Sequence, residues 1–189
     1  EIVDLGVVGD DFESTRQALA AAAKSVDCII SPGGVSVGEE DHVRAAVEAE
    51  GSLDLWKLAI KPGKPLAAGK VRGTQFFGLP GNPVSAIITF VLIVRPCLLR
   101  MSGCDSLMPA SFYLPAAFAR PESGQRQEYL RVTVQAGEDS KQSLLPFNNQ
   151  SSGVGSSLSG ADGLAIIPAY TSVAMGDSLE YLPFSELLY

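Results

Sequence analysis

The chain has 189 residues, of which 46% are apolar, and its 14 basic and 21 acidic residues give a net charge of −7. Such a chain can bury a sizeable core as one large or two small domains. The acidic balance, without any Lys/Arg-rich run, argues against a nucleic-acid partner.

The cysteines and the hydropathy of the chain indicate in which cellular compartment the protein is expected. The three cysteines, Cys28, Cys97 and Cys104, are an odd number without metal-like spacing, which favours a reducing cytoplasm. The longest uncharged apolar run, Val84 to Val94, is shorter than the ~20 residues of a membrane-spanning helix. We therefore expect a cytoplasmic protein without a membrane partner.

The first hundred residues alternate strand and helix signals. Residues 1–8, "EIVDLGVV", predict a strand, and "DDFESTRQALAAAAKS" predicts a helix with Asp11 or Ser14 as its N-cap. The run "VDCIIS" is typical of a buried strand. After a Gly-rich segment, "DHVRAAVEAE" predicts a helix that ends at Gly51, and "LWKLAI" and "QFFGL" predict further strands.

A long apolar helix is predicted over residues 84–99, with a kink or break near Pro96 because proline lacks the N–H of a helical hydrogen bond. We expect this helix to be buried in the sheet domain. The alternation predicts an α/β fold, a three-layer and mostly parallel sheet domain over residues 1–105.

The pattern changes after residue 105. Short β-rich segments such as "SFYLPAAFA", "EYLRVTVQ" and "DSLEYLPF" are separated by Gly, Ser, Asn and Pro clusters, which predicts a small all-β domain over residues 106–189. The Ser/Gly-rich stretch over residues 148–163 has the composition of a flexible linker. We favour a short helix inside a functional loop.

Two strand-to-helix turns carry the main functional signal. In "CIISPGGVSVGEED" and "FFGLPGNPVSAII", a buried strand ends in a Gly-rich turn that opens a helix. Free N–H groups at a helix start, its dipole and the missing Cβ atoms together suit an anion. Ordinary turns of an α/β protein also need Gly and Pro. The candidate anion-binding residues are Gly33, Gly34, Ser36 and Gly38 in the first turn and Pro80, Gly81, Asn82, Pro83 and Ser85 in the second.

Charged residues flank these turns. Lys57, Lys61 and Lys64 lie close together in "WKLAIKPGKP" and could bind an anion, or could be ordinary surface lysines. Asp10 and Asp41 follow the strand and Gly-rich signals and could hold Mg²⁺ or orient a water molecule. Each is equally well explained as a helix cap or a first-turn carboxylate.

The motifs "SPGGVSVGEEDHV", "KLAIKPGKPLAAG" and "FGLPGNPVSAIITF", in this order, resemble the molybdopterin molybdenumtransferase family, which includes the E domain of gephyrin. The resemblance implies the last step of molybdenum cofactor synthesis: adenylylated molybdopterin is hydrolysed, AMP leaves, and molybdate is inserted into the dithiolene. Molybdate and adenylylated molybdopterin would be the substrates, Mg²⁺ the metal, and other proteins of the pathway the partners.

The resemblance also assigns roles to residues. It implies that Asp10 and Asp41 are catalytic and hold the metal, and that the three lysines and the second turn bind anions. In the β-rich half, Arg131 of "EYLRV" and a serine near Ser151 or Ser152, for which we take Ser152, resemble residues that reach the molybdate or terminal phosphate. Serine and arginine suit a tetrahedral oxyanion because they donate one bond and a planar fork respectively.

Family members carry about half of their length upstream of the region that this chain resembles, and their site lies between the subunits of a homodimer. We therefore expect a ligand-binding half-site with little activity of its own. Two alternatives stay open: a molybdopterin adenylyltransferase, which has a similar sheet domain but no β-rich tail, and a gephyrin-like scaffold without enzymatic activity.

Overall fold

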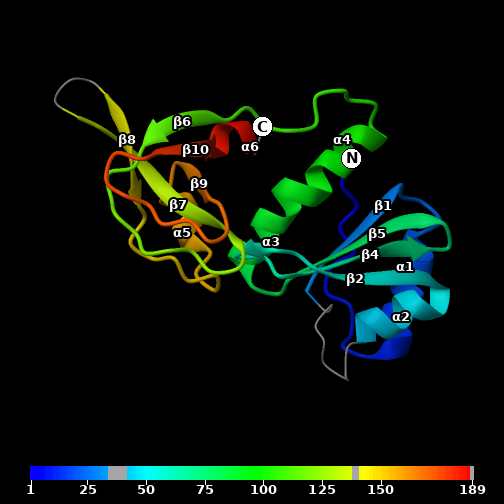
Figure 1. Ribbon diagram of the computed structural model, residues 1–189. Helices are drawn as coiled ribbons and strands as arrows, with labels where there is room; N and C mark the ends of the chain where they lie inside the picture. Colours follow the sequence, from blue (N-terminus) through cyan, green and yellow to red (C-terminus); the bar gives the residue numbers. More distant parts are fainter. Residues whose placement is uncertain (34–41, 138–140, 188–189) are drawn as a thin grey trace. The chain divides into compact units, whose positions relative to one another are not determined.

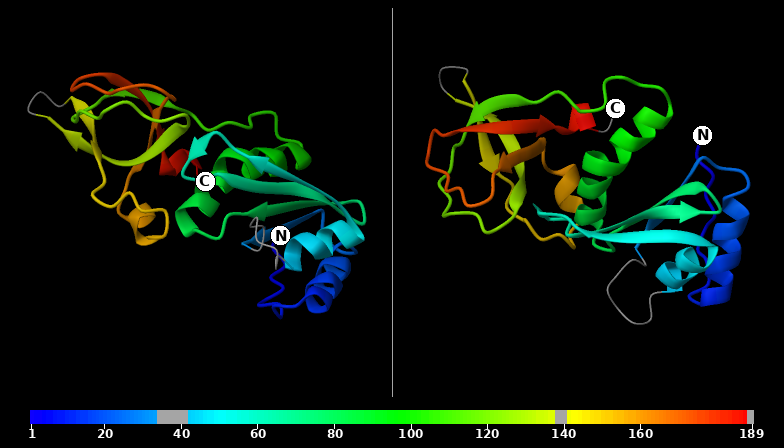
Figure 2. Two further views of the ribbon diagram at one scale, coloured as in Figure 1. Left: turned by 60° about the horizontal axis from the view of Figure 1, so that its bottom comes forward. Right: turned by 45° about the vertical axis from the view of Figure 1, so that its right-hand side comes forward.

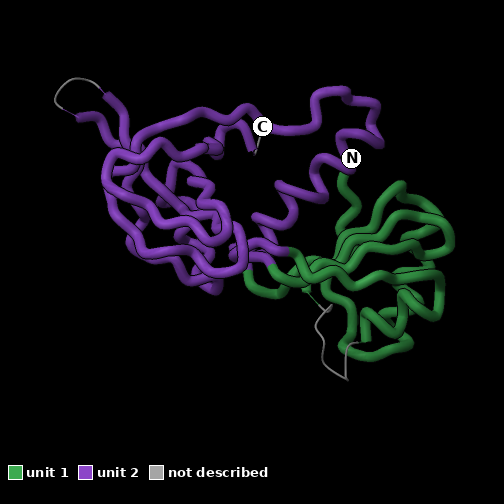
Figure 3. Tube along the Cα trace, in the orientation of Figure 1, with its two compact units in different colours: residues 1–58, 64–82 green, residues 59–63, 83–189 purple. Residues whose placement is uncertain are grey.

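The computed structural model describes residues 1–33, 42–137 and 141–187 (Figure 1). The chain forms two compact units (Figure 3). Unit 1 contains Glu1–Leu58 and Lys64–Asn82, and unit 2 contains Ala59–Gly63 and Pro83–Tyr189. We expected the chain to divide near residue 105. In the structure the helix that follows Asn82 packs within unit 2, as does the short excursion 59–63.

Unit 1 is a four-stranded sheet in the order β1 (Cys28–Pro32), β5 (Thr74–Leu79), β4 (Pro65–Val71) and β2 (Gly51–Lys57). Only the pairing of β1 with β5 is parallel among these described strands, so the prediction of a mostly parallel sheet is wrong. The cause is the tight turn at Arg72-Gly73, where both residues have positive φ, 50° and 92°. This geometry closes an antiparallel hairpin between β4 and β5.

Two helices cover one face of this sheet. They are α1 (Phe12–Ala22), capped by the Asp11 carboxylate, which accepts a hydrogen bond from the Ser14 amide, and α2 (His42–Glu50). Figures 1 and 2 show the two helices side by side below the strands. Their apolar residues pack on Phe76 and Val71 of the sheet. Unit 1 alone therefore has two layers rather than the predicted three.

The N-terminal segment, residues 1–10, forms no strand, which corrects the prediction for "EIVDLGVV". A strand needs a hydrogen-bonded neighbour, and these residues pair with none in the described part of the chain. Gly6, at φ 67°, also interrupts the extended backbone. Apolar side chains of the segment are therefore exposed, including Ile2 and Val7.

Unit 2 is rich in β-structure, as predicted. Its sheet has the order β3 (Ile60–Lys61), β7 (Gln127–Ala136), β9 (Gly163–Ile167), β10 (Ser178–Pro183) and β6 (Phe112–Pro115), and β8 (Gln142–Pro146) also pairs with β7. A short helix, α6 (Phe184–Leu187), follows β10. The predicted short helix in the Ser/Gly-rich stretch is confirmed as α5 (Ser156–Ser159).

The long apolar helix is present, and by its contacts it belongs to unit 2. It comprises α3 (Pro83–Thr89), the π-helical turn η1 (Phe90–Val94) and α4 (Arg95–Met101). Pro96 explains the π turn, because its ring crowds the carbonyl one turn earlier and its missing N–H cannot bond to it. The predicted break is therefore a local widening through which the helix continues.

This helix is long and apolar enough to cross a membrane by length and composition alone. Its residues Val84, Ile88 and Val91 are buried against Leu164 and Leu182 of the second sheet. Buried residues occur in α3 and η1 but not in α4, so the expectation of a buried helix holds for its first part only. The expectation that the protein has no membrane partner stays a prediction.

Candidate functional site

The two Gly-rich turns begin side by side in unit 1. β1 and β5 are parallel and in register at Pro32 and Leu79, and the Gly33 amide donates to the Leu79 carbonyl at 3.0 Å. Gly33 has a φ of 100°, and a Cβ atom built on it would lie 3.8 Å from the Cα of Gly81. The sequence predicted that both turns lie at strand carboxyl ends, and the structure brings Gly33 and Gly81 together there.

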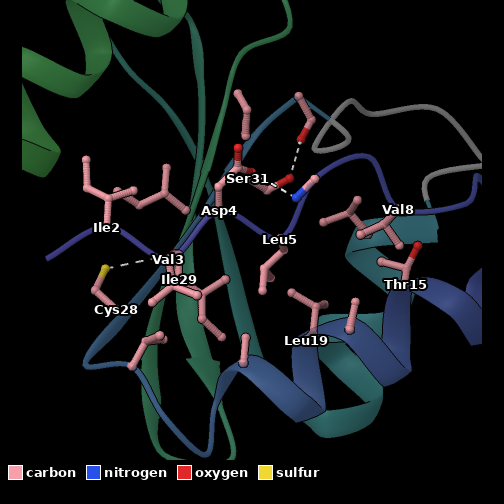
Figure 4. A pocket seen from close by; sticks show the side chains of 18 of the residues that line it. Ile2, Val3, Asp4, Leu5, Val8, Thr15, Leu19, Cys28, Ile29 and Ser31 are labelled. Carbon is pink, nitrogen blue, oxygen red and sulfur yellow. Dashed lines mark hydrogen bonds between the residues drawn. The ribbon is translucent and has the colours of Figure 1, made fainter.

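A cavity of about 680 Å³ opens next to the first turn (Figure 4). It lies between the N-terminal segment, α1 and β1, with Leu5, Leu19 and Ile29 among the apolar residues of its walls. Asp10 and Ser31 also line it, and Asp10 is exposed. The other predicted residues of this turn, Gly34, Ser36, Gly38 and Asp41, lie outside the described residues.

The second turn divides between the units. Pro80, Gly81 and Asn82 belong to unit 1, where Pro80 is buried and the other two are exposed. Pro83 starts α3 in unit 2, at a helical position where its missing N–H costs nothing. The next amide is already bonded, because Val84 donates to the Ser152 carbonyl at 3.1 Å. Ser85, also predicted in this turn, is buried in the helix.

The three lysines do not form one cluster within a unit. Lys57 and Lys64 lie in unit 1, where the Leu58 amide donates to the Lys64 carbonyl at 2.7 Å. Lys61 lies in unit 2 and its Nζ is 2.9 Å from Glu128, a buried carboxylate that Arg120 also contacts. Lys61 therefore neutralises a carboxylate of its own unit. An additional role in anion binding stays a prediction.

Arg131 is a buried arginine of unit 2 whose guanidinium is only partly hydrogen-bonded. It lies on β7, only 1% exposed, and its Nη2 donates to the Asn149 carbonyl at 3.1 Å. Its Nε and Nη1 are buried without a hydrogen-bond partner among the described residues. Burial lowers the pKa of the guanidinium from its ordinary value. Because buried donors normally find partners, these two nitrogens point to a ligand atom that completes the site.

The serines of the predicted oxyanion site lie in the loop 147–152, which contacts both Arg131 and the start of α3. The Ser151 amide donates to the Asn149 side chain at 2.9 Å, and the Ser151 hydroxyl accepts a long bond from Gly153 at 3.4 Å. The Ser152 carbonyl accepts from Val84, which places the half-buried Ser152 beside the helix N-terminus. In the described structure neither serine hydroxyl donates a hydrogen bond, and Ser152 is the one whose backbone contacts the start of α3.

Sequence reasoning missed Gln150, whose side chain makes three hydrogen bonds to backbone atoms. Its Oε1 accepts from the Arg131 amide at 3.2 Å, and its Nε2 donates at 2.8 Å to the carbonyls of both Arg131 and Phe147. From sequence alone, a polar residue in a Ser/Gly-rich loop is expected to be hydrated. Only the structure shows that the Gln150 side chain bonds to backbone atoms of Arg131 and Phe147.

The fit of the site to Mg²⁺ rests on Asp10 and Asp41. No group of three or more His, Cys, Asp or Glu side chains gathers within residues 1–33, 42–137 and 141–187. Mg²⁺ can be held by one or two carboxylates when substrate phosphates and waters complete its shell. The exposed Asp10 is compatible with such binding, and we assign no step to the ion.

Comparison with known proteins identifies the family. Residues 1–100 match the family model described as "Probable molybdopterin binding domain". The chain belongs to this molybdopterin-binding family. Residues 113–184 match the family model described as "MoeA C-terminal region (domain IV)".

Similar proteins carry the same identification. A molybdopterin molybdenumtransferase of Haemophilus influenzae is 47% identical over 103 residues, 54% of this chain and 26% of that protein. Molybdopterin molybdenumtransferase 2 of Mycobacterium tuberculosis is 31% identical over 95% of this chain and 45% of its own length. A crystal structure of the MoeA protein of Pyrococcus horikosii has a TM-score of 0.73 at 29% identity, covering 95% of this chain and 42% of that chain. This chain therefore spans less than half of each relative.

Proposed function

We propose that the chain supplies the substrate-binding half of a molybdopterin molybdenumtransferase. In this proposal, the turns at Gly33 and Gly81 receive the phosphates of adenylylated molybdopterin, and Arg131 with Ser152 receives molybdate. Hydrolysis of the substrate's anhydride releases AMP, and molybdate enters the dithiolene. The relatives named as molybdenumtransferases and the matches to both domain families support this proposal.

The single observation that carries the proposal is the buried guanidinium of Arg131. An oxyanion that accepts from Nε or from Nη1 would satisfy a buried donor and neutralise a buried charge. The Ser152 hydroxyl and the start of the long helix add a further donor and a favourable dipole. Both bidentate edges of a guanidinium include Nη2, which here also donates to the Asn149 carbonyl.

Four finer features belong to the same proposal: the metal, the compartment, the oligomer and the partners. Mg²⁺ would bind at Asp10 and Asp41 with the substrate phosphates, and the complete protein would act as a cytoplasmic homodimer with other proteins of the pathway. A dimer would supply the parts of the site that lie outside this chain, because the relatives are more than twice its length.

Binding of molybdate tests the proposal directly. We would dialyse the protein against sodium molybdate and measure bound molybdenum by mass spectrometry, for wild type and for Arg131→Gln. We expect the variant to bind at least about tenfold more weakly, because a bond to a charged donor contributes about 1.5–3 kcal/mol. Arg100→Gln is the matched control, since Arg100 is an exposed arginine of the same unit. Equal molybdate binding by Arg131→Gln and wild type would contradict the proposal.

A further inference from the structure

The loop that faces Arg131 is attached to β7 at a gap in the sheet. On one edge of β7, β9 pairs continuously from Glu128 to Val132. On the opposite edge, β3 pairs only as far as Glu128, and β8 begins to pair at Val132. Residues 129–131 therefore have no paired strand on that edge. The Arg131 carbonyl there accepts from the Phe147 amide at 2.8 Å, and the Arg131 N–H must find another partner.

The side chain of Gln150 fills this gap. Its amide presents an oxygen to the Arg131 N–H, at 3.2 Å, and a nitrogen to the Arg131 carbonyl, at 2.8 Å, as a neighbouring strand would. The same nitrogen donates to the Phe147 carbonyl, which ties the loop to itself. A primary amide can serve in this way because it carries a donor and an acceptor side by side.

We propose that Gln150 is a positioning residue for oxyanion binding, acting through Arg131 and the loop 147–152. This inference rests on the proposed function. The flanking residues of Gln150 are the ones that complete the site: the Asn149 carbonyl holds Nη2 of Arg131, and the second residue after Gln150 is Ser152, whose carbonyl caps the Val84 amide. The Gln150 side chain, together with the backbone bond from the Phe147 amide to the Arg131 carbonyl, thus holds the loop that carries Asn149 and Ser152 on Arg131.

The physical reason is the direction of the Arg131 donors. Nη2 is occupied by Asn149, so Nε and Nη1 remain for a ligand only while the loop stays in this place. If the loop shifts, Arg131 can turn toward other carbonyls, and Ser152 loses its place beside the helix. Binding of a rigid tetrahedral anion falls steeply when its donors are displaced by a fraction of a bond length.

The experiment compares Gln150→Met, which keeps the length of the side chain but removes its polar atoms, with wild type. Gln150→Glu is the second variant, which keeps an acceptor and places a negative charge beside Arg131. Gln135→Met is the matched control, because Gln135 lies on β7 with Arg131 and its side-chain amide contacts only Ser143 in the described structure. Gln150 is exposed, so we expect all three variants to fold.

Two readouts separate positioning from general stability. Molybdate and sulfate affinities are measured by calorimetric titration far below the melting temperature. Amide hydrogen exchange of Arg131 is followed by NMR, with the Val134 amide, which donates to Asp162 at 2.7 Å, as the internal reference. We expect Gln150→Met to bind both anions about tenfold more weakly, the loss typical of one hydrogen bond to a buried group. Exchange should accelerate at Arg131 and not at Val134, and Gln150→Glu should bind most weakly.

The outcomes are distinct. If wild type binds the anions, Arg131→Gln does not, and Gln150→Met binds as wild type does, the positioning role is overturned while the proposed function stands. Unchanged exchange at the Arg131 amide in both Gln150 variants overturns it as well. If wild type binds neither molybdate nor sulfate, the proposed function fails and the inference fails with it.

Discussion

Replacing Arg131 by methionine should raise the stability of unit 2 and abolish its response to molybdate. Each buried unsatisfied donor costs about 1–3 kcal/mol, and Arg131 has two such nitrogens among the described residues. The substitution also removes the bond from Nη2 to Asn149, which contributes about 1.5–3 kcal/mol because the donor is charged. Methionine fills much of the same apolar space. The balance favours the variant by about 1–2 kcal/mol, or roughly 3–8 °C in melting temperature.

In the presence of molybdate, wild type should become more stable than Arg131→Met. At one hundred times its dissociation constant, a ligand stabilises the folded state by about 2.7 kcal/mol, and the variant should gain none of this. Calorimetry with and without molybdate measures both effects, and hydrogen exchange of the β7 amides assigns the transition to unit 2. Arg100→Met, which removes an exposed guanidinium, should change neither. The reasoning is refuted if Arg131→Met melts below wild type without molybdate and is still stabilised by it.

Two further predictions concern each unit in turn. Hydrogen bonds from Arg72 and then Arg16 lower the pKa of Glu50, so this carboxylate contributes stability above about pH 4.5 that is lost as pH falls through its lower folded pKa. Glu50→Gln should therefore lower the melting temperature of unit 1 near pH 7 and flatten its acid dependence, followed by Trp56 fluorescence, whereas the exposed Glu48→Gln should do neither. In unit 2, Gly63→Ala should cost about 1–3 kcal/mol by denaturant titration, because Gly63 has a φ of 114° and a Cβ would lie 2.7 Å from a threonine hydroxyl. Gly124→Ala, where a Cβ would meet no atom within 4 Å, should be close to neutral.

Local patterns predicted the helices well. The apolar spacing of α1 and α2 and the Asp11 cap are properties of a dozen neighbouring residues, and the structure confirms them. Sheet pairing was predicted less well because it depends on turns and on distant residues. The hairpin at Arg72-Gly73 requires a positive φ at an arginine, which carries no turn signal of the Asn-Gly kind. A mostly parallel sheet was the wrong inference for that reason.

In the candidate site, too, features set by local sequence were predicted and features set by long-range pairing were not. Gly33 and Gly81 were predicted from their turns, and the register of β1 with β5 brings them together. Lys61 was grouped with its sequence neighbours, but the pairing of β3 with β7 places it beside Glu128, 67 residues away. No sequence pattern predicted a structural role for Gln150, because its contacts with Arg131 depend on the gap on the edge of β7. Such contacts depend on which distant strands pair, and a short stretch of sequence carries no information about that pairing.

Two charged residues of β7 show why Arg131 is better explained by binding than by folding. Glu128 is buried and is met by two cations of its own unit, Lys61 and Arg120. Arg131, three residues along the same strand, is buried more deeply, and a neutral carbonyl is the one hydrogen-bond partner of its guanidinium on the part of the chain that the structure describes. A buried charge without a counter-charge destabilises the folded state, and an apolar side chain of similar size would pack there at lower cost. The arrangement becomes favourable when an anion from solution supplies the counter-charge and an acceptor for one of the unpartnered nitrogens. The free energy of this interaction then contributes to the affinity for the anion and not to the stability of the unliganded protein.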